Sequence, residues 1–345
     1  MSLKKFNKKY PYIIAEIGVN HEGNLSIAKK LIKLAKKGGA DAVKFQTYKA
    51  DTLTSKNSPA YWDTKVNKIS NQHELFSKYD SFNEKEYQLL FAYCESVGID
   101  FASTPFDEKS VDTLYPMLSY YKIASADITN FPLLRKVSKK RKPIILSTGA
   151  SNKREISEAL RELKKYGAKE ICLMHCILSY PTVDHDANLN MITDMKKSFP
   201  NISIGYSDHT RPDKNMVACT AAYLKGAMII EKHFTHDKKL PGNDHFHAMD
   251  ISDLKVLKYN LNMLNSLEGK NSKNYLPTEK MARKHARRSI VINQDIKTGT
   301  KIKAKYLICK RPASGISPIY FDKIVGMTTK RDLKADEILK WSHIS

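Results

Sequence analysis

The chain has 345 residues, and 41% of them are hydrophobic, which is enough to build one large domain and a second small one. No apolar run reaches the roughly 18 residues of a transmembrane helix, and the basic N-terminus lacks the apolar core of a signal peptide. The net charge of +22 admits nucleic acid or an anionic substrate as a partner, but the lysines are scattered and no nucleic-acid recognition motif is present. We therefore expect neither a membrane nor a nucleic acid as partner.

Short apolar, β-branched runs alternate with helical patterns over the first three quarters of the chain. The runs expected as strands are residues 12–16, 41–46, 100–104, 120–125, 143–147, 170–176, 202–206 and 228–230. The segments with helical periodicity are residues 25–37, 84–97, 107–118, 129–138, 152–166, 187–198, 213–224 and 251–267. Residues 47–83 are mostly polar and too long for an ordinary connection, so we expect a functional loop above the strand ends.

Eight strands that alternate with helices predict an α/β fold, a (β/α)₈ TIM barrel, for residues 1–269. The competing architecture is an open doubly wound sheet, which would carry a glycine-rich phosphate fingerprint after its first strand. The turn at that place reads GVNHEGN and lacks the GxGxxG spacing. The barrel is therefore the preferred prediction.

The composition changes after Gly269. Residues 270–285 are polar without a strong period and are expected to form a linker. From residue 286 to 345, short β-like runs alternate with turns, which predicts a small, mainly β domain. Because so small a domain is only marginally stable alone, we expect it to pack against another surface.

The five cysteines are an odd number, and no two form a CxxC pair. Cys172 and Cys176 share one face of an expected strand, an arrangement that suits packing better than a disulfide. We therefore expect reduced thiols and a cytoplasmic protein.

Two expected strands, residues 202–206 and 228–230, flank one helix, so they should be parallel neighbours whose C-terminal ends open on one rim. The first strand is followed by Ser207 and His209, and the second by Glu231 and His233. Either histidine alone would be interpreted as an ordinary hydrogen-bonded side chain. Two imidazoles at one rim suit a divalent metal with open coordination positions, so we predict a metal site at His209 and His233.

Other strands also end in reactive side chains, namely Glu16, Lys44, Gln46, Thr104, Lys122, Ser125 and Ser147. A lysine at a barrel rim can form a Schiff base or hold an anion. The hydroxyls of Ser125, Ser147, Thr148 and Ser207, with the backbone N–H groups of the STGAS turn, suit a phosphate. These residues predict a small, highly anionic substrate and leave an aldolase, a phosphatase and a condensing enzyme open.

The chain resembles the sialic acid synthase family, which makes nonulosonic acids from phosphoenolpyruvate and an N-acylated hexosamine. The matching stretches are IIAEIGVNHEG, GADAVKFQT, STPFD, YKIAS, ILSTGAS, HC with YPT, GYSDHT, EKHFT, ARRSIV, KRP and GISP. The last three lie in a part that is similar to type III antifreeze proteins, the SAF domain. The resemblance implies a phosphoenolpyruvate-dependent transferase that uses Mn²⁺ or Mg²⁺. It also implies a domain-swapped homodimer in which the small domain of one subunit caps the barrel of the other.

The resemblance further implies roles for single residues. Phosphoenolpyruvate contacts match Lys44, Lys122, Ser125, Ser147 and Ser207. Sugar contacts match Gln46, Tyr180, Asp244 and, reaching over from the second subunit, Arg311. His209 and His233 match the metal ligands, and Glu16 matches the carboxylate near the metal-bound water. Thr104 and Asp127, the latter in place of the glutamate usual in the family, complete the expected substrate contacts.

Two departures from the family pattern bear on the substrates. Ile177, Leu178 and Ser179 replace a segment in which the family often has Asn or Thr, so one phosphoenolpyruvate contact is expected to be lost or moved. GNDH replaces GPDH near the expected sugar. N-acetylmannosamine is the expected acceptor, and the acceptors of legionaminic, pseudaminic or octulosonic acid synthases are the alternatives. A non-enzymatic anion- or nucleic-acid-binding protein is the competing class. Such a protein would have no use for two metal-binding histidines beside two lysines.

Overall fold

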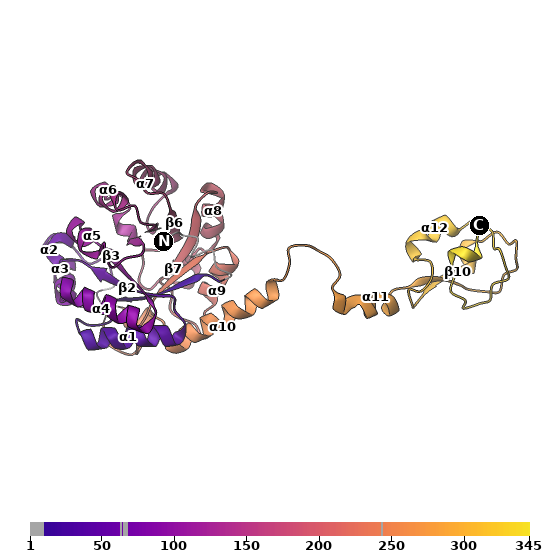
Figure 1. Ribbon diagram of the computed structural model, residues 1–345, viewed down its shortest axis with the longest axis horizontal. Coiled ribbons are helices and arrows are strands. Elements are labelled where there is room, and N and C mark those ends of the chain that lie inside the picture. The colour runs from indigo at the N-terminus through magenta and orange to yellow at the C-terminus, as the bar shows by residue number, and fades with distance from the viewer. Residues whose placement is uncertain (1–9, 63, 65–67, 243) are drawn as a thin grey trace. The chain divides into compact units, whose positions relative to one another are not determined.

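The structure is a computed structural model that describes residues 10–62, 64, 68–242 and 244–345. The chain divides into two compact units, Met1–Gly269 and Lys270–Ser345, each of which has its own hydrophobic core (Figure 1). The two units are described separately below.

Eight parallel strands form the sheet of the first unit. They are β1 (Tyr12–Gly18), β2 (Ala42–Thr47), β3 (Asp100–Pro105), β4 (Tyr121–Ile123), β5 (Ile144–Ser147), β6 (Ile171–His175), β7 (Ser203–Asp208) and β8 (Ile229–His233). Their order in the sheet is β3-β2-β1-β8-β7-β6-β5-β4, and the two outermost strands, β3 and β4, also lie side by side. The sheet therefore curls into a nearly closed barrel, and the predicted fold class is confirmed.

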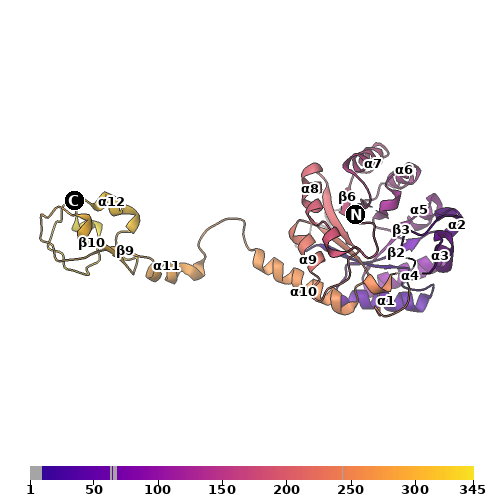
Figure 2. The same cartoon turned by 180° about the vertical axis from the view of Figure 1, so that it is seen from behind.

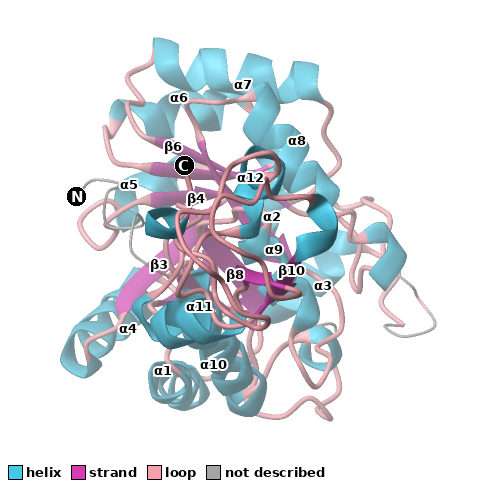
Figure 3. Cartoon of the chain, turned by 90° about the vertical axis from the view of Figure 1, so that its right-hand side faces the viewer, coloured by secondary structure: helices cyan, strands magenta, loops and turns pink. Residues whose placement is uncertain are grey.

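Helices surround this barrel, as the view in Figure 3 shows. They are α1 (Leu25–Gly38), α4 (Glu84–Val97), α5 (Glu108–Leu114), α6 (Phe131–Lys139), α7 (Lys153–Lys165), α8 (Asn190–Ser198), α9 (Val217–Leu224) and α10 (Ile251–Glu268). Local sequence fixes several of their ends. The side chains of Asn24, Asn83, Asn152 and Asp250 accept hydrogen bonds from first-turn N–H groups, and Gly98 ends α4 in the left-handed conformation.

The stretch 47–83, expected as one long loop, contains two short helices, α2 (Ala50–Leu53) and α3 (Gln72–Tyr79). The expected position above the strand ends is supported, since Tyr61, Leu75 and Tyr79 line the cavity there, but the expectation of an irregular loop was wrong for these two segments. The physical reason is local, because the side chain of Asn71 caps the N–H of Glu74 and starts α3. Residues 63 and 65–67 of the stretch lie outside the described residues.

The interior of the barrel changes from apolar to polar along the strands. Its apolar layer consists of Tyr12, Ile14, Ala42, Ala102, Tyr120, Ile145, Cys172, Met174 and Ile229. Successive side chains of a strand point to opposite faces, so residues two positions further along point into the barrel again. Those residues are polar: Glu16 follows Ile14, and Lys44 follows Ala42. The alternation thus collects charged groups at the C-terminal mouth of the barrel.

The second unit contains an antiparallel pair, β9 (Ser289–Ile292) and β10 (Leu307–Lys310), together with the short helices α11 (Lys280–Ala286) and α12 (Phe321–Ile324), as Figure 2 also shows. Its core consists of Ile290, Ile292, Ile296, Ile302, Leu307, Ile316, Ile324, Leu333, Leu339 and Ile344. Helix α11 occupies part of the segment expected as a linker, so residues 270–285 are not irregular throughout. The expectation that this unit packs against another surface stays a prediction.

No helix in the described ranges combines the length and the apolar character that crossing a lipid bilayer requires.

Candidate functional site

A cavity of about 450 Å³ lies at the C-terminal ends of the barrel strands. Its walls bring together the first-unit residues to which the resemblance gives a role: Glu16, Lys44, Gln46, Thr104, Lys122, Ser125, Asp127, Ser147, Tyr180, Ser207, His209, His233 and Asp244. Arg311 belongs to the second unit, where it is exposed just after β10. The shared cavity supports one site, and the individual roles stay predictions.

A buried network of two lysines and two glutamates forms part of the cavity wall. The Nζ atom of Lys44 lies 2.5 Å from Glu16 Oε2 and 3.8 Å from Glu231 Oε1. Lys122 Nζ lies 3.4 Å from the same Glu231 oxygen and donates a 2.8 Å hydrogen bond to Ser147 Oγ. Two positive charges balance two negative ones, so the network is neutral as a whole before any substrate enters.

The two glutamates of this network differ in acidity. Burial raises the pKa of Glu16, and the nearby Glu231 carboxylate adds to this, while Lys44 opposes it only in part. For Glu231, burial is outweighed by Lys122 and Lys44, which together lower its pKa. Burial would also lower the pKa of Lys44, but the two glutamates outweigh it and raise that pKa. Glu16 is therefore the carboxyl suited to proton transfer, and Lys44 stays charged.

Glu231 was expected at the rim from the sequence but was given no role in the site. It links both lysines and accepts a 3.2 Å hydrogen bond from Ser207 Oγ. The signal was present, because Glu231 and His233 are two positions apart on one strand and must share a face. The same alternation puts Lys232 on the opposite face.

His209 and His233 lie next to each other, as the metal prediction requires, with ring centroids 5.6 Å apart. His209 Nδ1 lies 2.6 Å from the carbonyl oxygen of Ile177, and His233 Nδ1 lies 2.9 Å from Asp244 Oδ2. The first contact holds a proton on Nδ1 of His209 and leaves its Nε2 as an acceptor. The Asp244 carboxylate faces Nδ1 of His233 as an ion pair, as carboxylates often face the outer nitrogen of metal-binding histidines. The donor set therefore fits a divalent metal.

Protonation also distinguishes the two histidines. Burial and the neighbouring His233 lower the pKa of His209 to about 4, so His209 is neutral near pH 7. Burial would lower the pKa of His233 as well, but the Asp244 carboxylate outweighs it and raises that pKa. A metal at this place would therefore compete with a proton on His233.

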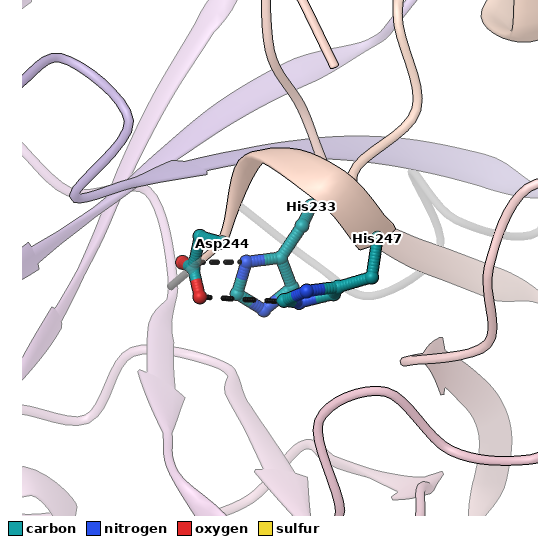
Figure 4. Close-up of side chains that lie close together, drawn as sticks. All are labelled: His233, Asp244 and His247. Atoms are coloured by element: carbon teal, nitrogen blue, oxygen red, sulfur yellow. Dashed lines mark ion pairs between the residues drawn. The ribbon is translucent and has the colours of Figure 1, made fainter. Parts of the chain in front are cut away.

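Asp244 does more than face the cavity, because it belongs to a cluster with His233 and His247 (Figure 4). One potential ligand atom from each of the three residues lies within 4.8 Å of the others, and all three side chains are buried. The sequence analysis missed His247. His247 lies two residues after the GNDH stretch and follows no strand or helix periodicity, so no spacing rule relates it to His233.

The expected phosphate contacts are only partly in place. Ser125, Ser147 and Ser207 line the cavity, but Thr148 does not. The Thr148 hydroxyl donates a 2.9 Å hydrogen bond to the carbonyl of Met174, and its backbone N–H bonds to the same oxygen. The proposal of Thr148 as a phosphate donor was therefore wrong, because both of its donors are used within the barrel wall.

Behind the two histidines, a second buried ion pair joins β7 to β8. Lys232 Nζ lies 2.7 Å from Asp208 Oδ2 and donates a 2.5 Å hydrogen bond to the carbonyl of Thr210. Tyr206 donates a 2.9 Å hydrogen bond to the other carboxylate oxygen of Asp208. Burial raises the pKa of Asp208, but Lys232 outweighs this and lowers it to about 2. Asp208 and Lys232 thus lie outside the barrel interior, one residue before His209 and His233.

Comparisons with known proteins agree with this geometry. Residues 31–273 match the model of the NeuB family, and residues 287–345 match the SAF domain. The chain is 39% identical to the N,N'-diacetyllegionaminic acid synthase of Legionella pneumophila, over 96% of this chain and 94% of that protein. It is 32% identical to the N-acetylneuraminate-9-phosphate synthase of Drosophila melanogaster, over 94% of both chains.

Among solved structures, the sialic acid synthetase of Leptospira borgpetersenii in complex with citrate matches with a TM-score of 0.69 and 32% identity. The match covers 79% of this chain and 90% of that one. The family model covers well over half of the 345 residues, and the curated relatives match along nearly their full length. The chain belongs to the NeuB family, with a SAF domain at its C-terminal end.

Proposed function

We propose that this chain condenses phosphoenolpyruvate with an N-acylated hexosamine to form a nonulosonic acid, with release of phosphate. The observation that carries the proposal is the pair of buried lysines, Lys44 and Lys122, beside the pair of histidines in one cavity. The names of the relatives support a sugar acid synthase.

The lysines suit the charge of phosphoenolpyruvate. This substrate brings a carboxylate and a phosphate close together, and each lysine can neutralise one of them. Ser147 already accepts a hydrogen bond from Lys122, and Ser125 adds a hydroxyl donor in the same cavity, while the Ser207 hydroxyl there already donates to Glu231. Glu16 and Glu231 hold the two lysines in place by ion pairs. An incoming anion would form ion pairs with the same two lysines.

His209 and His233 are the residues that would hold a divalent metal, Mn²⁺ or Mg²⁺. When bound there, the metal would supply Lewis-acid polarisation of the C1 carbonyl oxygen of the open-chain sugar. Asp244 orients His233 through the contact at Nδ1, and the ring of Tyr180 packs 4.3 Å from that of His209. These contacts fix both imidazoles before any substrate arrives.

In the proposed reaction, C3 of phosphoenolpyruvate forms a bond to C1 of the sugar, and C2 becomes electron-poor. Water adds to C2, and its proton passes to the Glu16 carboxylate, whose raised pKa suits that transfer. The C2–oxygen bond to phosphate then breaks while the new C2 hydroxyl gives its proton to the leaving phosphate, which leaves a ketone at C2 and inorganic phosphate. The proton held by Glu16 passes to the oxygen on sugar C1, which becomes a hydroxyl. The lysines stay charged throughout, so no Schiff base forms.

The acceptor sugar has a second candidate besides N-acetylmannosamine, namely a hexose with two acetamido groups. Relatives named N,N'-diacetyllegionaminic acid synthase are 39% identical to this chain, against 32% for the neuraminate relative from Drosophila. The cavity lining also includes the largely apolar side chains of Leu53, Tyr61, Phe76, Phe106 and Leu178. Apolar side chains suit the methyl groups of acetamido substituents.

The proposal includes a cytoplasmic, homodimeric protein. All five cysteines are free, which supports a reducing compartment. The homodimer rests on the resemblance to domain-swapped relatives, and Arg311 provides its test in the Discussion.

The deciding experiment measures phosphate release from phosphoenolpyruvate with Mn²⁺ against a panel of sugars. The panel contains N-acetylmannosamine, a diacetamido hexose, their 6-phosphates and pentose phosphates. We expect release with an N-acylated hexosamine and none with a pentose phosphate. Release only with a pentose phosphate would indicate an octulosonate-type synthase. No release with any sugar, together with salt-dependent binding to random DNA, would support the non-enzymatic class instead.

A further inference from the structure

His247 is fully buried next to the histidine pair. It lies on the 3-10 turn His245–His247 between β8 and α10. Its ring centroid is 4.9 Å from that of His233 and 5.9 Å from that of Tyr180. Figure 4 shows its ring beside that of His233, with Asp244 on the other side of His233.

The ring nitrogens of His247 are unusual because neither has a hydrogen-bond partner among the described residues. The closest charged group is Asp244, whose Oδ1 lies 3.9 Å from Nε2, beyond hydrogen-bond distance. Buried imidazoles are nearly always hydrogen-bonded. His245, on the same turn and equally buried, follows this rule, with Nδ1 2.7 Å from the Thr235 hydroxyl.

The position of these nitrogens suits an ion. Potential ligand atoms of His233, Asp244 and His247 all lie within 4.8 Å of one another. A transition metal with bonds of about 2.0–2.2 Å holds its ligand atoms at most about twice that far apart. Movement of these side chains toward one another would bring His247 and His233 onto one ion; the group does not include His209, whose ring lies beside that of His233.

We propose that His247 is a third imidazole ligand of the metal centre formed by His209 and His233. This inference rests on the metal in the proposed function, and it further implies which metal ion the site prefers. Imidazole nitrogens favour later first-row metals such as Co²⁺ and Zn²⁺, Mn²⁺ binds them least tightly among the first-row divalent ions, and Mg²⁺ prefers oxygen ligands. With three imidazoles the site selects a transition metal and discriminates against Mg²⁺.

The test measures metal binding by the full-length chain after treatment with a chelator. Mn²⁺ affinity is followed by electron paramagnetic resonance, Mg²⁺ affinity by competition, and the geometry of the site by the visible spectrum of bound Co²⁺. The variants are His247→Phe, which keeps the aromatic packing, and His247→Gln, which keeps a polar side chain. His245→Gln serves as the matched control, because it changes an equally buried histidine on the same turn.

We expect both His247 variants to weaken Mn²⁺ binding by more than the roughly 10- to 100-fold that the loss of an outer-shell partner causes. Mg²⁺ affinity should change less, so the preference for Mn²⁺ falls, and the Co²⁺ spectrum should shift. His245→Gln should leave the affinity and the spectrum unchanged. Thermal unfolding with chelator present checks that each variant is folded, and if His247→Phe does not fold, His247→Gln decides.

The possible failures are distinguishable. Unchanged Mn²⁺ affinity and an unchanged Co²⁺ spectrum in a folded His247 variant would overturn this inference and leave the metal at His209 and His233 intact. If the unaltered chain binds neither Mn²⁺ nor Co²⁺, the metal in the proposed function is wrong as well. Equal losses in His245→Gln and His247→Gln would indicate that the turn only packs the site, which also overturns the inference.

Discussion

At the scale of single residues, the proposed chemistry depends on the charges of Lys44 and Lys122. Replacing either by methionine keeps much of the side-chain volume and removes one positive charge from the buried network. We expect kcat/KM for phosphoenolpyruvate to fall at least about 100-fold, roughly 2.7 kcal/mol of transition-state stabilisation, while the KM for the sugar changes little. Steady-state kinetics with each substrate varied in turn measures this split.

The same lysines allow a second measurement. If Lys44 or Lys122 acted as an aldolase-type nucleophile, borohydride with substrate would trap a covalent lysine adduct that mass spectrometry detects. We expect no adduct, because burial, which would lower the pKa of Lys44, is outweighed by the Glu16 and Glu231 carboxylates, which raise that pKa and keep the amine protonated. A trapped adduct would contradict the condensation mechanism.

Glu16 should govern the pH dependence of the reaction. A general base must be ionised, so activity falls when the pH drops below the pKa of Glu16, which burial raises above the ordinary value for glutamate. We expect kcat to show an acidic limb at a correspondingly higher pH. Glu16→Gln should lose most of kcat and lack this limb in the residual activity, whereas an unchanged limb would assign it to another group.

Residue-level prediction from the sequence succeeded where strand alternation applies. Six of the predicted residues lie in strands or at strand ends: Glu16, Lys44, Gln46, Lys122, Ser147 and His233. Because the C-terminal ends of parallel barrel strands open on one rim, the predicted topology places them in one cavity. Glu231 follows the same rule, and a strict count of alternate positions would have found it. His247 obeys no such rule, since it lies on a turn whose path depends on tertiary packing.

At the scale of elements, the ion pair of Asp208 and Lys232 fixes the ends of β7 and β8. Asp208→Asn leaves Lys232 as a buried, unpaired charge, which should lower the free energy of unfolding by about 3–5 kcal/mol. Lys232→Met should destabilise similarly, and the double variant less than the sum, since the two residues share one interaction. Urea unfolding at neutral pH measures all three.

The pH dependence of the same pair has a definite sign. The folded-state pKa of Asp208 is lowered to about 2, so its ionisation stabilises the fold above the ordinary pKa of aspartate. That stabilisation is lost as the pH falls from about 4 toward 2. The stability difference between the unaltered chain and Asp208→Asn should therefore shrink over this range. A constant difference would show that Asp208 acts through packing alone.

Element boundaries were harder to predict than the elements themselves. The sequence placed the end of the eighth strand at residue 230, because polar residues follow it. In the structure β8 continues to His233, since its backbone stays paired with β1 as far as Glu16. The strand was predicted to end too early because its last residues are polar. At the mouth of a barrel, backbone pairing between strands continues through residues whose side chains are charged. The helices α2 and α3 were missed because they are short and flank an irregular stretch.

At the scale of the whole molecule, the fold class was predictable because eight repeats of strand and helix leave few alternatives. The second unit was recognised by its change in composition, but the ten-residue core that holds it together was not, since its hydrophobic residues follow no regular period. The resemblance assigns this unit to the barrel of a second subunit, which stays a prediction. How it contributes to the site is therefore a matter for experiment on the assembled protein.

Arg311 provides that experiment. It is exposed in a loop after β10, and its guanidinium can donate paired hydrogen bonds to sugar or amide oxygens in a way that lysine cannot. If it serves the barrel of a second subunit, Arg311→Ala alone should fold normally and lose most of its turnover. His209→Ala should likewise be inactive through loss of a metal ligand. Each variant then lacks a different half of the same site.

Mixing the two inactive variants separates action in a second subunit from action within one chain. A heterodimer contains one barrel with intact His209, and the arginine that reaches it comes from the His209→Ala subunit, which retains Arg311. Part of the activity should therefore return on mixing, up to one working site per heterodimer. Arg283→Ala, which alters an exposed arginine on α11, serves as the control and should stay active alone. If differently tagged subunits co-purify as heterodimers and no activity returns, Arg311 acts in its own subunit or has no part in the reaction.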